Sequence, residues 1–144
     1  MSREPETRRR RAREVAFRLA YQADLAGESA GDAWQRSRGE EPLTEDQLGL
    51  VEDVVRTLST LADEVDRLLA EAAEHWQLDR LAATDRAVLR GAVAELLARP
   101  GVPARVVLDE AITLAGRYGS ADSGRFVNGV LDRVARRLRP EELS

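Results

Sequence analysis

Hydrophobic residues near the C-terminal end of the chain fall on one side of a helix. Between Asp122 and Leu138 they follow the i, i+1, i+4, i+5, i+8 spacing of a buried helix face. Asp122 or Ser123 is expected to cap this helix, and Pro140 follows its last apolar position. The residues of this stripe are Phe126, Val127, Val130, Leu131, Val134 and Leu138.

Two residues inside this segment have low helix propensity. Gly129 costs about 1 kcal/mol relative to alanine in a helix interior, and Asn128 precedes it. We expect Gly129 to allow a neighbouring helix to approach closely and Asn128 to hydrogen-bond a buried backbone group. A direct contact with a ligand is the alternative.

The same spacing recurs along most of the chain. No window shows the alternation of a strand, so the predicted fold class is all-α, a compact helical bundle with short connections. Residues 1–6 are polar and contain Pro5, and we expect them to be disordered. The predicted helices cover 8–26, 45–75, 85–98 and 103–118. Two short helical turns are predicted between them. One covers 32–37 and contains Trp34, and the other covers 76–81 and places Trp76 in the core.

Helix starts are marked by capping residues. Thr7 and Thr84 precede two of the predicted helices, and Thr44 with Gln47 has the form of a capping box. Gly27 is expected to end the first helix.

Composition narrows the class of protein. A chain of 144 residues with 43% hydrophobic residues can bury one sizeable core, which predicts a single domain. The absence of Cys excludes disulfides, thiolate chemistry and Cys-based zinc sites. No apolar run is long enough for a membrane span, and no apolar segment follows the arginine-rich start. We therefore expect a cytoplasmic protein with no membrane partner.

The net charge of −4 is unevenly distributed. Residues 1–26 carry seven Arg and four acidic residues, a net +3, and residues 116–139 carry six Arg and two Asp, a net +4. Residues 40–75 carry two Arg and eleven acidic residues, a net −9. The acidic block is expected to be a solvated helix face, and docking of a basic partner is the alternative.

Catalytic chemistry has little support in the sequence. There is no Gly-rich phosphate loop, no Ser/His/Asp arrangement, and only one imidazole, His75, which we expect to be structural or solvent-facing. Asp109 and Glu110 are adjacent, so they do not share one helix face. The prediction is a protein without catalytic residues, metal or cofactor, and not an enzyme.

Four sequence elements together resemble the transcription antitermination factor NusB family. They occur in the family's order and span nearly the whole chain. They are R-R-R-A-R-E at 9–14, D-R-A-V-L-R at 85–90, V-P-A-R-V at 102–106 followed by D-E-A-I at 109–112, and F-V-N-G-V-L-D at 126–132.

The resemblance implies a single RNA-binding domain over 1–144. Its helices would form two packed subdomains, about 1–75 and 76–144. The implied function is binding of the single-stranded boxA element in nascent ribosomal RNA transcripts. The implied partners are NusE, a small-subunit ribosomal protein, and the antitermination complex with RNA polymerase. Formation of a homodimer that hides the RNA surface is a further possibility that the resemblance does not decide.

Functional residues are implied by motif position. At the positions of Gly91 and Ala94 the family usually has larger residues. The resemblance therefore does not decide how much their helix contributes to the partner surface. The implied RNA-binding residues are Arg9, Arg10, Arg11, Arg13, Asp122 and Phe126, and those on the side that meets NusE are Tyr21 and Asp85.

The physical chemistry of these residues agrees with that role. Arginine donates paired hydrogen bonds to phosphate, and Phe126 or Tyr21 would stack on unpaired bases. Arg9 and Arg13 share one helix face, with Arg10 beside it. We therefore expect replacement of Arg10 and Arg13 to weaken RNA binding with little change in thermal stability.

Two other classes of protein are consistent with the sequence. One is the RNA-binding domain of a ribosomal RNA methyltransferase, although no cofactor-binding domain is expected here because none follows Ser144. The other is a helical adaptor that binds only protein. RNA titration at low salt distinguishes the adaptor from an RNA-binding factor.

Overall fold

The structure is a computed structural model that describes residues 3–73 and 77–143. Within these ranges it contains helices and no strand, which confirms the all-α prediction. His75 and Trp76, for which the sequence predicts positions, lie outside the described residues. The helices are α1 (Arg3–Ala26), α2 (Ala30–Ser37), α3 (Glu45–Thr60), α4 (Ala62–Ala72), the 3₁₀ turn η1 (Leu78–Arg80), α5 (Ala83–Ala98), α6 (Ala104–Tyr118), α7 (Ser123–Leu138) and α8 (Pro140–Leu143).

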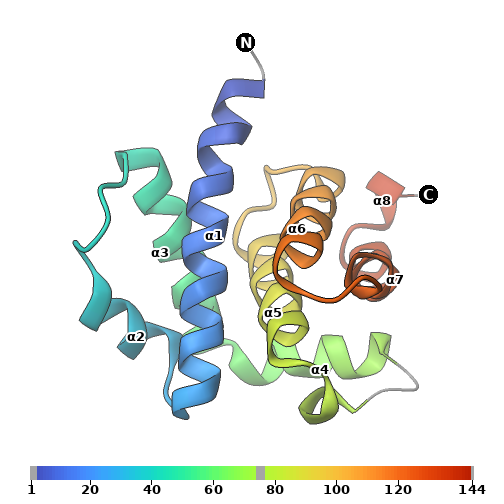
Figure 1. The fold of residues 1–144 in the computed structure, drawn as a ribbon. Coiled ribbons are helices and arrows are strands. Elements are labelled where there is room, and N and C mark those ends of the chain that lie inside the picture. The colour runs from blue at the N-terminus through green and yellow to red at the C-terminus, as the bar shows by residue number, and fades with distance from the viewer. Residues whose placement is uncertain (1–2, 74–76, 144) are drawn as a thin grey trace.

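Helix α1 crosses the molecule, with α2 and α3 on one side and α5, α6 and α7 on the other (Figure 1). It begins at Arg3, earlier than predicted, because proline is tolerated in a first helical turn, where the backbone N–H has no helical partner. Its predicted end is confirmed. Gly27 adopts φ 69°, and the Glu28 N–H donates to the Ala23 carbonyl at 3.0 Å, as in a Schellman motif.

The helix predicted over 45–75 is wrong in one respect, because the structure divides it into α3 and α4. Leu61 has φ −120° and ψ 32°, outside the helical region, and its N–H closes α3 by donating to the Thr57 carbonyl. The preceding Ser59 and Thr60 are poor helix formers, and the Thr60 hydroxyl donates to the Arg56 carbonyl. The change of direction allows α4 to pack against α5 and α7.

Capping was predicted correctly at one helix start and incorrectly at three others. Thr7 lies inside α1, which begins at Arg3. Thr44 and Gln47 form the capping box, with bonds of 3.2 and 2.8 Å. Helix α5 begins at Ala83, before Thr84, and no side chain caps it. Asp122 precedes α7 without a side-chain cap bond. Ser123 is the first residue of α7, and its hydroxyl accepts the Ser120 N–H at 2.9 Å.

Two clusters of buried side chains form the core. The first lies between α1, α2 and α3 and includes Leu50 and Trp34. The second joins α4, α5, α6 and α7, and α1 contributes Phe17 to it. The division into two subdomains near residue 75 stays a prediction; α4, which precedes that position, packs in the second cluster.

The stripe on α7 is buried as predicted, with Phe126 and Leu138 at its half-buried margins. The expectations for the two residues inside it are wrong. Asn128 is exposed, and a Cβ added at Gly129 would meet no atom within 4 Å, so no neighbouring helix requires the glycine. Gly91 also has open space around it, whereas Ala94 is fully buried in the first core cluster. In the described part of the chain, no helix is both long and apolar enough to cross a membrane.

Candidate nucleic-acid interface

Three arginines near the start of α1 lie at the surface, and each is held by a carboxylate from another part of the chain. Arg10 donates two hydrogen bonds of 2.9 Å to Glu110 of α6. Arg9 donates to both oxygens of Asp46 at 3.2 and 3.3 Å, and Arg11 pairs with Glu41. A phosphate that binds this arginine group, residues 9–11, therefore has to replace carboxylates.

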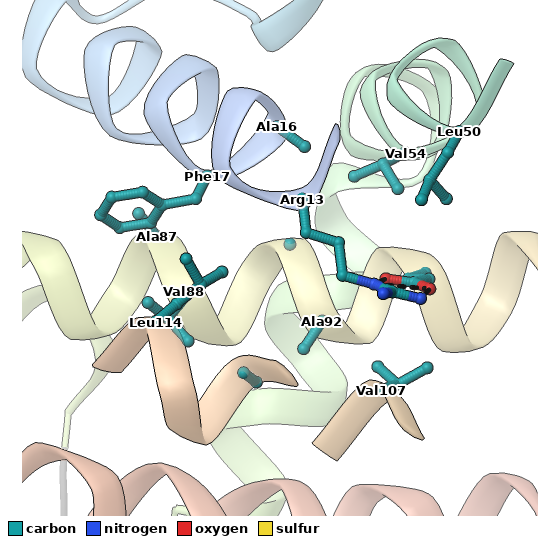
Figure 2. Close-up of a pocket in the computed structure, with 13 residues that line it drawn as sticks. Arg13, Ala16, Phe17, Leu50, Val54, Ala87, Val88, Ala92, Val107 and Leu114 are labelled. Atoms are coloured by element: carbon teal, nitrogen blue, oxygen red, sulfur yellow. Dashed lines mark hydrogen bonds and ion pairs between the residues drawn. The ribbon is translucent and has the colours of Figure 1, made fainter. Parts of the chain in front are cut away.

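Arg13 is different from its neighbours because its side chain points into the core. It is 5% exposed and donates to Glu95 of α5, which is 3% exposed, with the shortest bond at 2.7 Å. The pair borders a small internal cavity of about 20 Å³, and Figure 2 shows the Arg13 side chain running from α1 across α5. The predicted surface position of Arg13 is wrong because the helix turns this residue toward α5.

Much of the acidic block is paired within the molecule. Asp46 and Glu41 hold arginines of α1, while Asp66 of α4 accepts two bonds from Arg90 at 2.9 and 3.0 Å. Asp53 of α3 accepts from Arg99 at 2.6 Å. These carboxylates are counter-charges for the protein's own arginines, an arrangement that neither of the two interpretations of the block anticipated.

The acidic partners make stability depend on pH. A hydrogen bond from Arg9 lowers the pKa of Asp46, and one from Arg18 lowers the pKa of Glu41. Because their folded-state pKa values are depressed, their stabilisation is present above the unfolded-state pKa of about 4 and is lost as the pH falls through the lower folded-state value.

We therefore expect the free energy of unfolding to fall as the pH drops below about 4. Urea titrations over a pH series measure this change. The variant Asp46→Asn, which lacks one titrating group, should show a smaller acid-side loss than the wild type. Parallel curves for the two proteins would contradict a contribution from the Arg9–Asp46 pair.

Aromatic side chains follow the arginine group along α1. The rings of Phe17 and Tyr21 lie 6.3 Å apart, and Phe17 stacks on Tyr118 of α6 at 5.0 Å. Tyr118 is 45% exposed, and its hydroxyl donates to Glu14 at 3.0 Å. Tyr118 could not be identified from the sequence as part of this surface, because its place before Gly119 indicates only the end of a helix.

An open groove of about 320 Å³ lies between the starts of α5 and α7. It contains Asp85, predicted on the partner side, together with Asp122 and Phe126, predicted on the RNA side. Arg80 and Ser120 also line it. The fold therefore brings three of the predicted residues together, while the arginine group and Tyr21 lie outside this groove. We call it the α5–α7 groove.

The arginine group and the α5–α7 groove are connected by α6. This helix runs beside α1 in the same direction, since Arg10 contacts Glu110 near the middle of α6 and Glu14 contacts Tyr118 at its end (Figure 1). The chain then turns through 119–122 to reach the groove. The arginine group therefore contacts α6 directly, and the groove begins just beyond the end of this helix, at Ser120. Among the described residues, no group of three or more potential metal ligands lies together.

Known proteins resemble this chain along almost its whole length. A family model described as the NusB family matches residues 10–136. The transcription antitermination protein NusB of Anaeromyxobacter dehalogenans strain 2CP-1 is 47% identical over 135 residues, covering 93% of this chain and 94% of that protein. NusB of Koribacter versatilis strain Ellin345 is 38% identical over 134 residues, covering 92% of each.

Solved structures also resemble this chain. T. maritima NusB has a TM-score of 0.85 and 34% identity, covering 94% of this chain and 95% of that one. A chain in the crystal structure of antitermination factors NusB and NusE in complex with dsRNA has a TM-score of 0.73 and 29% identity, covering 91% and 98%. The match in sequence, length and fold shows that the chain belongs to the NusB family.

Proposed function

We propose that this protein is a transcription antitermination factor that binds the single-stranded boxA element of nascent ribosomal RNA together with NusE. The observation that carries the proposal is the connection of the arginine group through α6 to the α5–α7 groove, in a chain of the NusB family. A related chain crystallised with NusE and dsRNA supports it. The role is non-catalytic and is exercised in the cytoplasm, within the complex on RNA polymerase.

Charge and shape support RNA as the ligand. The net charge of −4 disfavours RNA binding unless positive charge is concentrated, and residues 1–26 and 116–139 carry net charges of +3 and +4. Guanidinium groups bind phosphate through paired hydrogen bonds, and the half-buried ring of Phe126 offers a surface on which a base would stack.

NusE is proposed to bind next to the RNA. Tyr21 and Asp85 are the residues assigned to this partner, and Asp85 lies in the same groove as Phe126. A protein bound at Asp85 would therefore sit beside a base stacked on Phe126. This proximity favours cooperative assembly, because the partner adds contacts to the same strand.

A titration of RNA with and without NusE tests the proposal. The affinity for an RNA that carries boxA should rise at least fivefold at saturating NusE, on the order of the smallest coupling typical of linked sites. A matched RNA with a scrambled element is the control and should gain less. Binding of NusE with no measurable RNA affinity at low salt would leave the protein-binding adaptor as the function.

A further inference from the structure

Arg80 is an exposed arginine at the edge of the α5–α7 groove. Its guanidinium makes no ion pair or hydrogen bond with any residue in the described ranges 3–73 and 77–143, unlike those of the arginine group. An anion that binds Arg80 has no carboxylate to displace. Among all the groups that line this groove, it is the one with a permanent positive charge.

The backbone that carries Arg80 is fixed in place. Arg86 of α5 donates from one nitrogen to the carbonyls of Leu78 and Leu81, at 3.1 and 2.9 Å, on either side of Arg80. The same guanidinium pairs with Asp24 of α1 at 2.7 Å. The η1 turn is thus tied to two helices, so the exposed side chain of Arg80 extends from a rigid base.

The other groups of the groove determine how a nucleotide would lie in it. Asp85 and Asp122 are acceptors when ionised and would repel a phosphate placed between them. One Asp85 oxygen is shielded from solvent without a hydrogen-bond partner, and Asp85 itself lines the groove, so the carboxylate has an unsatisfied acceptor beside it. Bases carry N–H donors and ionised phosphates do not. The base therefore belongs inside the groove and the phosphate at Arg80.

We propose that Arg80 and Phe126 together bind one nucleotide of the RNA, with the base stacked on Phe126 and a neighbouring phosphate bound by Arg80. This inference rests on the proposed function and adds Arg80 to the RNA-binding residues. Stacking on an aromatic ring and phosphate binding by arginine are the two general means of holding an unpaired strand. Here the aromatic ring and the arginine line the same groove.

The test measures binding of a boxA-containing RNA at saturating NusE over a salt series. Arg80→Ala should weaken binding about fivefold near 0.1 M salt and flatten the salt slope by about 0.7, the contribution of one phosphate on a single strand. Arg56→Ala is the matched control. It removes the same charge from an exposed side chain of α3 and should change affinity less than about twofold.

A second pair of variants separates phosphate binding from stacking. Arg80→Lys keeps the charge and should retain the salt slope. Phe126→Leu keeps an apolar side chain and should weaken binding about tenfold with the slope unchanged. If both residues hold one nucleotide, the losses in the Arg80→Ala/Phe126→Leu double variant should be smaller than the product of the single losses.

Three results would overturn the inference. They are wild-type affinity in Arg80→Ala, equal losses in Arg80→Ala and Arg56→Ala, and independent losses in the double variant. In each of these cases the wild-type protein still binds RNA with NusE. Failure of this site is therefore distinct from failure of the proposed function. Thermal unfolding of each variant checks that the fold is retained.

Discussion

Replacing Arg13 with Ala is expected to destabilise the protein by about 3–5 kcal/mol, because it leaves the carboxylate of Glu95 buried without its main partner. Glu95 is 3% exposed and accepts hydrogen bonds from two nitrogens of the Arg13 guanidinium. For a chain of this length the loss corresponds to a Tm about 10 °C lower or more. Thermal unfolding followed by circular dichroism measures it.

The matched comparison is with an arginine one turn earlier. Arg9→Ala removes the same charge from α1, but its pair with Asp46 is partly exposed, so the expected loss is below about 1 kcal/mol. Replacing both members of the buried pair with apolar residues, as in Arg13→Met/Glu95→Leu, should recover most of the stability, since no unpaired charge is left behind.

This result would change how arginine substitutions in α1 are interpreted. A loss of RNA binding in Arg13→Ala would arise from unfolding, whereas the double replacement would restore both folding and RNA affinity. If Arg13→Ala unfolds at the wild-type temperature, the ion pair is not part of the stable core. If the stable double variant loses RNA affinity, Arg13 leaves the core to contact RNA.

The helices could be predicted from sequence where a single apolar stripe determines them. The stripe on α7 and the helix-ending Gly27 depend on residues that are close in the sequence. The break at Leu61 could not be predicted, because the apolar spacing continues through it into α4. The missing cap at Thr84 has a similar cause, since α5 starts one residue before the side chain that was expected to cap it.

The sequence names candidate site residues, but it does not show how they are arranged. Helical periodicity places Arg9 and Arg13 on one face, yet Asp46 holds one at the surface and Glu95 holds the other in the core. These partners are more than 30 residues away in the sequence, so no local pattern shows which arginine is buried. The proximity of Asp85 to Phe126 in the α5–α7 groove likewise depends on how α5 packs against α7.

Removing the charge of the whole arginine group is expected to weaken RNA binding about a hundredfold near 0.1 M salt. The variant is Arg9→Gln/Arg10→Gln/Arg11→Gln, in which glutamine keeps hydrogen-bond donors near the acidic partners. If three phosphates lose their contacts, the salt slope should flatten by about 2, at roughly 0.7 per phosphate. Affinity measured for boxA-containing RNA across a salt series gives both quantities.

A triple variant elsewhere on the surface separates local contacts from net charge. Arg36→Gln/Arg56→Gln/Arg67→Gln removes the same charge from exposed side chains of α2, α3 and α4. Because exposed charges farther away than a Debye length of about 10 Å are largely screened at 0.1 M salt, this control should lose far less affinity. Equal losses in the two triple variants would mean that RNA responds only to total charge, and α1 would then have no specific place in the interface.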